Sequence, residues 1–205
     1  MVFLNDPSRI IIKHQTNFVF DRVIPKDKLG GGGDLSGGQR ERIITYSFSS
    51  DTAYNEKHHN DIVDSILQDV EQWRPLHVKF VPFWKSPSRQ ADVYIHLSND
   101  KTIKKKCGFE GLSCAVLGGN NIYLNETNWT RGSAKSGLSL GDYRKYVMTH
   151  EMCHILGYLH EECSGAGDKV SIMTQQTLGT GECKPHGGNL HFNSSHPPKI
   201  STKWD

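Results

Sequence analysis

The feature that most constrains how this chain can fold is the run His150-Glu-Met-Cys-His154-Ile-Leu-Gly157-Tyr-Leu-His160. Two histidines four residues apart lie on one face of a helix, one turn apart, so His150 and His154 turn their rings toward the same point. Gly157 has no Cβ and can adopt a positive φ, which lets the chain end the helix and double back. We therefore expect a turn after the helix that brings His160 beside the other two histidines.

Three imidazoles at one point predict a metal site. Zinc sites with three protein ligands and an open fourth position are catalytic, whereas structural zinc sites are closed by four protein ligands. In a catalytic site the pKa of the bound water falls to about 7, and a neighbouring carboxylate can act as its general base. The sequence thus predicts one catalytic Zn²⁺ held by His150, His154 and His160, with Glu151 as the general base that later protonates a leaving amine.

With this motif the chain resembles the metzincin clan of zinc metallopeptidases, whose signature also includes a methionine in a turn beneath the metal. Ser171-Ile-Met173-Thr174 fits that Met-turn, since Met173 follows His160 closely enough for a tight turn to return under the histidines. A lone methionine is usually core filler, but the place of Met173 favours the Met-turn. The resemblance implies a metzincin-like zincin fold and hydrolysis of peptide bonds in a peptide or protein substrate.

A closer likeness is to a family of mostly uncharacterised actinobacterial proteins that are presumed to be metallopeptidases. It covers roughly residues 41–186 and rests on Tyr143-Arg through His160, Cys163, Met173-Thr-Gln-Gln-Thr177, Cys183-Lys-Pro185, and Ser113-Cys114 before Asn125 and Trp129. By this likeness Cys163 and Cys183 would be bridged and would clamp the Met-turn segment. The chain departs from metzincins at Cys153, where those proteins generally carry Gly or another small residue. Because Cys is small and often buried, we interpret Cys153 as packed rather than as a ligand.

The five cysteines all lie in the second half of the chain, and none forms the C-x-x-C pair typical of zinc knuckles or redox sites. Proximity favours two disulfide bonds, Cys107 with Cys114 and Cys163 with Cys183, and leaves Cys153 without a partner. Disulfide bonds indicate an oxidising or extracellular setting, whereas the first residues show no apolar segment typical of a cleavable signal peptide. The localisation is therefore left open.

The length of 205 residues predicts one globular unit with an appended arm. Residues 30–33 and 37–38 are all glycine, a composition that is typical of a flexible linker. We place a boundary near residue 40. Residues 1–40 are interpreted as an N-terminal arm with two short β-like stretches and a Gly-rich linker, and residues 41–205 as the metallopeptidase catalytic domain.

Hydrophobic periodicity predicts both strands and helices in the catalytic domain. Strand-like alternation of apolar and polar residues occurs in five segments: 44–48, 76–81, 91–97, 115–117 and 121–124. The last two flank Gly118-Gly-Asn-Asn, a sequence typical of a hairpin turn. Apolar residues at helical spacing predict one helix over residues 61–73, beginning at Asn60, and a second over residues 140–156, beginning at Ser139.

These elements predict an α+β fold. It has a twisted mixed sheet of about four or five strands, a backing helix, the helix with the histidines, and an irregular lower part after Gly157. By the resemblance to metzincins, a cleft runs between the sheet edge and the lower part, and the edge strand pairs with an extended substrate. We take the substrate-binding edge strand to be Asn121, Ile122, Tyr123, Leu124 and Asn125.

Charge and hydropathy exclude two classes of partner. Lys and Arg number 24 and Asp and Glu 22, so the chain has no broad positive field for a phosphate backbone, and we expect no nucleic acid. No segment approaches the roughly 18 to 20 apolar residues that span a membrane. The lysines at residues 104–106 are interpreted as part of a solvated loop. We expect a monomer.

The predicted function is that of a zinc-dependent endopeptidase, and two alternatives stay open. The first is a non-catalytic zinc-bearing binding or structural protein on the same fold. The intact Glu151 argues against it, because a site kept for structure alone has no need of a base. The second is a zinc hydrolase of another amide, such as a cell-wall cross-link, which only the shape of the pocket can distinguish.

Overall fold

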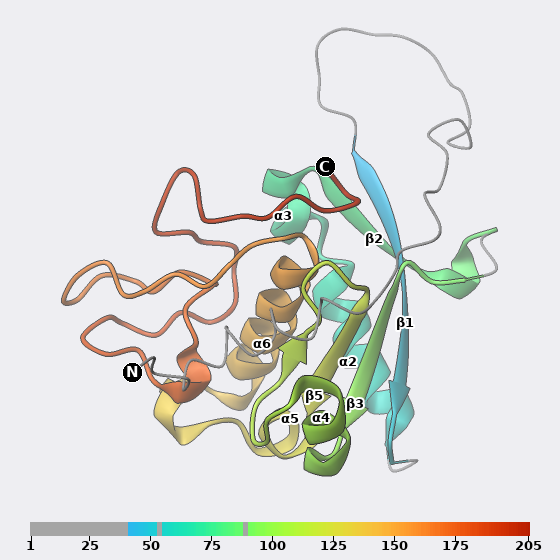
Figure 1. Cartoon of the computed structure of the whole chain (residues 1–205), viewed down its shortest axis with the longest axis horizontal. Coiled ribbons are helices and arrows are strands. Elements are labelled where there is room, and N and C mark those ends of the chain that lie inside the picture. Colours follow the sequence, from blue (N-terminus) through green and yellow to red (C-terminus); the bar gives the residue numbers. More distant parts are fainter. Residues whose placement is uncertain (1–40, 53–54, 88–89) are drawn as a thin grey trace, which may run out of the picture.

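The computed structural model describes residues 41–52, 55–87 and 90–205 (Figure 1). The predicted arm and Gly-rich linker, residues 1–40, lie outside the described residues, so the boundary near residue 40 stays a prediction. The described residues combine a five-stranded mixed sheet with several helices. The predicted α+β class and the expected number of strands are therefore confirmed.

The sheet has the strand order β2-β1-β3-β5-β4. Four strands run parallel, and the short β4 runs antiparallel to β5. The strands are β1 Arg42–Ser50, β2 Val78–Pro82, β3 Val93–Ser98, β4 Cys114–Ala115 and β5 Asn121–Asn125. The predicted hairpin is present, because Ala115 of β4 pairs with Ile122 of β5.

The edge of the sheet differs from the prediction. β5 lies between β3 and β4, so Asn121–Asn125 is an internal strand, and β4 is the outer strand on this side. The two strands of a hairpin carry the same kind of alternation, so the pattern does not tell which of them is outermost. The long-range parallel pairing of β5 with β3 decides it.

Alternate side chains of β5 point to opposite faces of the sheet. Ile122 and Leu124 are buried in the main core, together with residues of α2 and α6. Tyr123 lies on the other face, in a smaller cluster with Ile103 and Cys107 of α4. Helices therefore cover both faces of the sheet near β5, and α6 lies on the face of the main core.

The helices are α2 Glu56–Leu67, α3 Val70–Trp73, α4 Asp100–Cys107, α5 Glu126–Arg131 and α6 Leu140–Ile155, with 3-10 turns η3 Arg74–Leu76, η4 Phe83–Lys85, η5 Ala134–Ser136 and η6 Gln176–Leu178. The helix predicted to carry the histidines is α6, which ends one residue earlier than expected. Ser139 caps it: its hydroxyl accepts from the Asp142 N–H at 3.2 Å and donates to the Asp142 carboxylate at 2.7 Å. The N-terminus of α6 is therefore capped by the side chain of Ser139, where the sequence places the start of the helix.

The backing helix predicted over residues 61–73 begins earlier and is interrupted. α2 begins after Asn55, and a break before Asp69 separates it from α3. The additional first turn contains His59, which is buried and whose Nδ1 accepts a hydrogen bond from Trp129 Nε1 at 3.2 Å. This tertiary contact stabilises a helical turn that has no apolar periodicity of its own.

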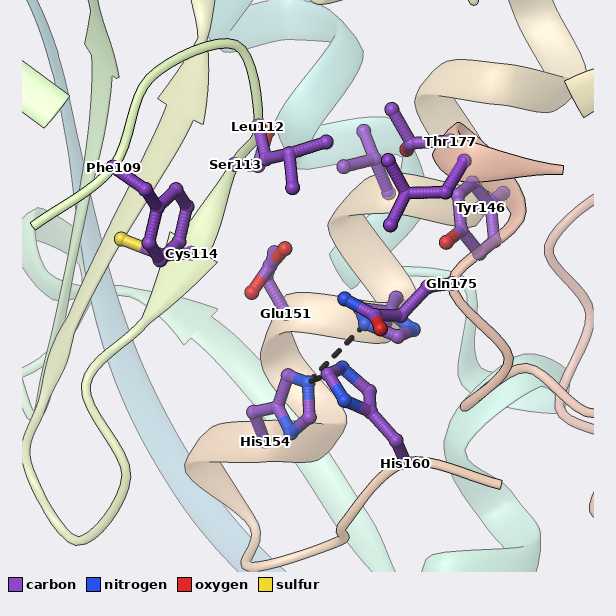
Figure 2. Close-up of a pocket in the computed structure, with 13 residues that line it drawn as sticks. Phe109, Leu112, Ser113, Cys114, Tyr146, Glu151, His154, His160, Gln175 and Thr177 are labelled. Atoms are coloured by element: carbon purple, nitrogen blue, oxygen red, sulfur yellow. Dashed lines mark hydrogen bonds between the residues drawn. The ribbon is translucent and has the colours of Figure 1, made fainter. Parts of the chain in front are cut away.

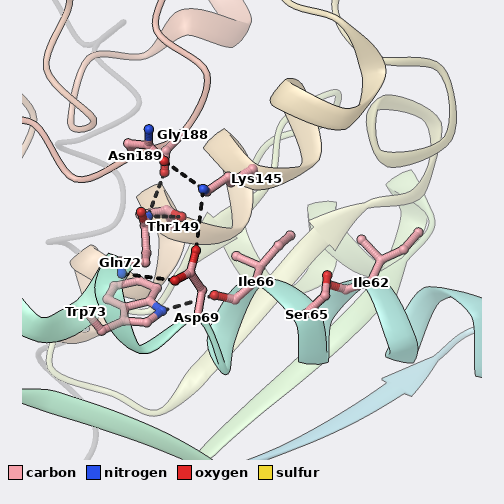
Figure 3. A network of polar contacts seen from close by, with 10 residues as sticks. All are labelled: Ile62, Ser65, Ile66, Asp69, Gln72, Trp73, Lys145, Thr149, Gly188 and Asn189. Carbon is pink, nitrogen blue, oxygen red and sulfur yellow. Dashed lines mark hydrogen bonds and ion pairs between the residues drawn. The ribbon is translucent and has the colours of Figure 1, made fainter.

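Gln72 joins the backing helices to α6 (Figure 3). Its side-chain nitrogen donates to the Thr149 hydroxyl at 3.2 Å and to the Gly188 carbonyl at 2.7 Å. Lys145 of α6 forms an ion pair with Asp69 at 3.7 Å. Since Thr149 immediately precedes the first predicted ligand, these contacts anchor α6 next to the site.

Two short helices were not predicted. The lysines at residues 104–106 lie in α4 rather than in a loop. Asn99 caps this helix through its side chain, and Gly108 ends it with φ 85°. Asn125 likewise caps α5 by accepting from the Asn128 N–H at 3.0 Å. Both helices span eight residues or fewer, which is too short to show a helical period.

The chain after Gly157 is irregular apart from η6, as predicted. The two disulfide bonds expected from proximity are present: Cys107–Cys114 and Cys163–Cys183. The first joins the end of α4 to β4, and the second closes the segment that contains Met173. Cys153 is free and fully buried in the main core, which confirms that it packs in the helix. Within the described ranges, no helix has the length and hydropathy needed to cross a membrane.

Candidate metal centre

α6 and the turn after it position three histidines. His150 and His154 lie one turn apart in α6, and Gly157 follows with φ 95°. The Gly157 N–H donates to the His154 carbonyl at 2.9 Å, which closes the helix. A Cβ at Gly157 would overlap the carbonyl oxygen of Ile200, so both the backbone angle and the packed C-terminal segment require glycine. The turn returns the chain so that His160 lies beside α6.

The Nε2 atoms of the three histidines converge (Figure 2). His154 Nε2 lies 3.2 Å from His150 Nε2 and 3.0 Å from His160 Nε2, and the ligand atoms all lie within 4.8 Å of one another. On the first two rings Nδ1 faces a backbone carbonyl, that of Ile172 at 2.8 Å and that of Tyr158 at 2.7 Å. Because a carbonyl only accepts, Nδ1 carries the proton and Nε2 the lone pair. Lone pairs that meet at one point fit a cation, so this group could hold a metal ion.

The environment keeps the two helical histidines neutral. Burial lowers the pKa of His150 well below the ordinary value, and the neighbouring His154 and His160 lower it further. Burial and the charge of His160 lower the pKa of His154 to about 3. Since a metal ion binds only the neutral imidazole, both rings are ready to act as ligands at neutral pH.

Glu151 and the three rings line a narrow cavity (Figure 2). Its volume is about 30 Å³, which is enough to admit a water molecule. The other walls come from the loop before β4, from α6 and from the segment after Met173, and include Leu112, Ser113, Tyr146, Val147, Gln175 and Thr177. A water-sized space therefore lies beside both the carboxylate and the converging nitrogens.

Burial raises the pKa of Glu151 to about 8, although a hydrogen bond from the Ala115 backbone opposes the shift. Ala115 belongs to β4, so the outer strand of the sheet contacts the predicted base. A carboxylate with a pKa near neutral pH can both accept and release a proton. Glu151 is thus suited in chemistry and position to acid–base work in the cavity.

Met173 lies in a tight turn beside the first histidine. The Thr174 N–H donates to the Ser171 carbonyl at 3.0 Å, and Met173 is fully buried. Ile172, one residue earlier, supplies the carbonyl that accepts from His150. The predicted tight turn is therefore present, while the role of the Met173 thioether as the floor of a metal site stays a prediction.

The residues predicted to bind substrate lie away from the cavity. None of Asn121–Asn125 is among the lining residues, whereas Cys114, the first residue of β4, and Ser113 before it are. The Asn125 side chain instead caps α5 and donates to Asp100 Oδ1 at 2.6 Å. The outer position of β4 explains the difference, because β4 separates β5 from the cavity.

Comparison with known proteins places the chain in a family. The family model described as "Protein of unknown function (DUF3152)" matches residues 40–189, which is most of the chain. The chain belongs to this family. The matched range includes the three histidines, Glu151 and Met173, but the description of DUF3152 names no activity, so the resemblance to metzincins stays a prediction. No significant match is found among the curated proteins.

Two features of this DUF3152 site were missed in the sequence. Glu161, directly after the third histidine, is buried, and its carboxylate accepts from the Ser171 hydroxyl and from the Asn193 N–H at 3.2 Å. Its own N–H donates to the Met173 carbonyl at 3.2 Å, so it ties the third histidine to the methionine turn. Tyr146 also lines the cavity, and its place one turn before the first ligand was a signal that could have been used.

Proposed function

We propose that the chain is a zinc-dependent endopeptidase. The observation that carries the proposal is the convergence of three histidine Nε2 atoms beside the buried Glu151 in a water-sized cavity. Three neutral imidazoles without a fourth protein ligand fit zinc in its catalytic arrangement. The described part of the chain shows no fourth His, Cys, Asp or Glu in this metal-binding group.

In the proposed reaction the chain's own residues bind, orient and move protons. His150, His154 and His160 would hold the ion, and the Ile172 and Tyr158 carbonyls orient two of their rings. When bound there, zinc lowers the pKa of a water molecule and polarises a carbonyl group. The Glu151 carboxylate takes the proton of the attacking water and delivers it to the leaving amine.

The position of the outer strand β4 supports the proposal that the substrate is a peptide. β4 is the last strand on its side of the sheet, and the residues before it line the cavity. An extended peptide can pair with such a strand through backbone hydrogen bonds, which makes few demands on side chains. Pairing along β4 would carry a scissile bond past Glu151, because the Ala115 backbone already contacts that carboxylate.

The experiment compares the wild-type protein with Glu151→Gln, a nearly isosteric change that removes the proton acceptor but no metal ligand. We expect one zinc per chain and an unchanged melting temperature in both proteins. Cleavage of an unstructured protein should be abolished by a chelator in the wild type and reduced about 10²- to 10⁴-fold in the variant. Undiminished cleavage by the variant would refute the mechanism, and a zinc-loaded wild type that cleaves no peptide would refute the proposed function.

A further inference from the structure

One polar side chain of the cavity makes no hydrogen bond to any residue that the structure describes. Besides Glu151 and the histidines, four residues with polar side chains line it: Ser113, Tyr146, Gln175 and Thr177. Three of them are engaged within the protein. The Ser113 hydroxyl accepts from a backbone N–H of β5 at 2.9 Å, the Tyr146 hydroxyl donates to the Thr174 carbonyl at 3.0 Å, and the Thr177 hydroxyl bonds that of Tyr143 at 3.0 Å.

Gln175 is the exception. Its side-chain amide makes no hydrogen bond to any residue that the structure describes, although its backbone is held in place. The next residue provides a contrast, because Gln176 is fully buried and uses both atoms of its amide. Its nitrogen donates to the His186 carbonyl at 3.1 Å, and its oxygen accepts from the His186 N–H at 2.9 Å.

The backbone around Gln175 is fixed to α6. Its carbonyl accepts from the Leu178 N–H at 2.9 Å, and the Gln176 N–H donates to the Tyr146 hydroxyl at 2.8 Å. Figure 2 shows the Gln175 side chain entering the cavity from the segment after Met173 and lying near the histidine rings. In this view Glu151 lies on the other side of the cavity. The fixed backbone keeps the base of the Gln175 side chain at the cavity wall, while its amide is free to bond a ligand.

We propose that Gln175 is a catalytic residue that donates a side-chain N–H to the oxygen of the scissile carbonyl. This inference rests on the proposed function. As the water oxygen bonds to the carbonyl carbon, Glu151 takes the proton and the carbonyl π electrons move to the oxygen, which becomes an oxyanion. When the intermediate collapses, the C–N bond breaks, the amine leaves with the proton from Glu151, and a carboxylic acid remains.

The choice of a donor role follows from the charges around the cavity. A developing oxyanion needs hydrogen-bond donors, and neither Lys nor Arg is among the described residues that line the cavity. The hydroxyl of Tyr146 already has a backbone acceptor, and Glu151 accepts protons rather than donating to an anion in the first step. The Gln175 amide has two N–H groups that no described residue accepts, and we therefore assign it as a side-chain donor to the oxyanion.

The test measures peptide cleavage, zinc content and thermal stability for wild type, Gln175→Ala and Gln176→Ala. Removing one oxyanion donor typically lowers kcat about 10²- to 10³-fold, and we expect this in Gln175→Ala with KM, zinc content and melting temperature unchanged. Gln176→Ala should instead lower the melting temperature, since it leaves two groups of His186 without their partners.

A binding measurement separates transition-state stabilisation from substrate positioning. A phosphinic peptide that matches the cleaved sequence has a tetrahedral anionic centre, so its affinity for zinc-loaded Gln175→Ala should fall with kcat/KM. The affinity of the product peptides should not change. If wild type cleaves peptides and Gln175→Ala retains its kcat, or loses zinc, the inference is overturned while the proposed function stands. If zinc-loaded wild type cleaves no peptide, both are overturned.

Discussion

Burial holds individual side chains of this protein in one protonation state, and His59 shows this away from the metal centre. Its Nδ1 accepts a hydrogen bond from Trp129, which only the unprotonated nitrogen can do. Desolvation, and then the charges of His58 and Arg144, lower the pKa of His59 from its ordinary value of 6.5. The unfolded chain regains the ordinary value, so it binds more protons than the folded chain below that pH.

We therefore expect His59→Gln, which offers a neutral acceptor to Trp129, to flatten the pH dependence of stability. In the wild type the free energy of unfolding should fall as pH drops below about 6.5, and His59 contributes to that slope. The measurement is denaturant unfolding between about pH 7.5 and 5, with His196→Gln, an exposed histidine, as the matched control. Equal slopes in wild type and His59→Gln would show that His59 does not titrate on unfolding.

At the scale of elements, the loop between α4 and β4 forms one wall of the cavity. Its residues Phe109 and Leu112 line the cavity, and the Cys107–Cys114 disulfide closes its base. Gly111 at its centre donates its N–H to Asp100 Oδ1 at 3.0 Å. The covalent link and this hydrogen bond together hold the wall against the site.

Replacing Cys107 and Cys114 together by Ser should loosen this wall without removing a metal ligand. The chain-entropy model gives a loss of roughly 2 kcal/mol for so short a loop. Hydrogen exchange of residues 108–113 should become faster and KM for a peptide should rise, while zinc content stays at one per chain. The matched control is the double replacement of Cys163 and Cys183, which should loosen residues 164–182 instead. Unchanged exchange in residues 108–113 would contradict the role of the disulfide.

Strands and helices were predicted correctly where their apolar residues recur with a clear period along the sequence. The alternation in residues 44–48 and 91–97 identified β1 and β3, and the capping signal at Ser139 placed the start of α6 correctly. The helices α4 and α5 were not predicted because each is too short to show a helical period, although Asn99 and Asn125 are typical N-caps. The start of α2 was predicted too late because its first turn is stabilised by a contact between His59 and the distant Trp129.

At the scale of the whole molecule, the C-terminal segment packs against the turn that carries the third histidine. The Leu159 N–H donates to the Pro198 carbonyl at 2.8 Å, and the Ile200 N–H donates to the Gly157 carbonyl at 2.9 Å. These bonds lie on both sides of Tyr158, just before His160. The position of the third ligand thus depends on chain that lies some forty residues further along the sequence.

Gly157→Ala tests this dependence. The new Cβ would meet the Ile200 carbonyl and lie 2.7 Å from Thr202 Cγ2, at a backbone angle that L residues rarely adopt. We expect a loss of stability of at least about 2 kcal/mol and weaker zinc retention against a chelator. Gly141→Ala in the first turn of α6 is the control, because its Cβ meets nothing within 4 Å and should not lower stability. Equal zinc retention in both variants would contradict the coupling.

The sequence by itself determined the local part of the site: the spacing of His150 and His154, the turn at Gly157 and the place of Glu151. These follow from helix geometry and from the conformational freedom of glycine, which act within a few residues. Only the tertiary structure decided that β4 rather than Asn121–Asn125 lies outermost, and that the Gln175 side chain lines the cavity beside the histidines. Strand order and cavity walls depend on packing between segments far apart in the chain, and no local pattern records that packing.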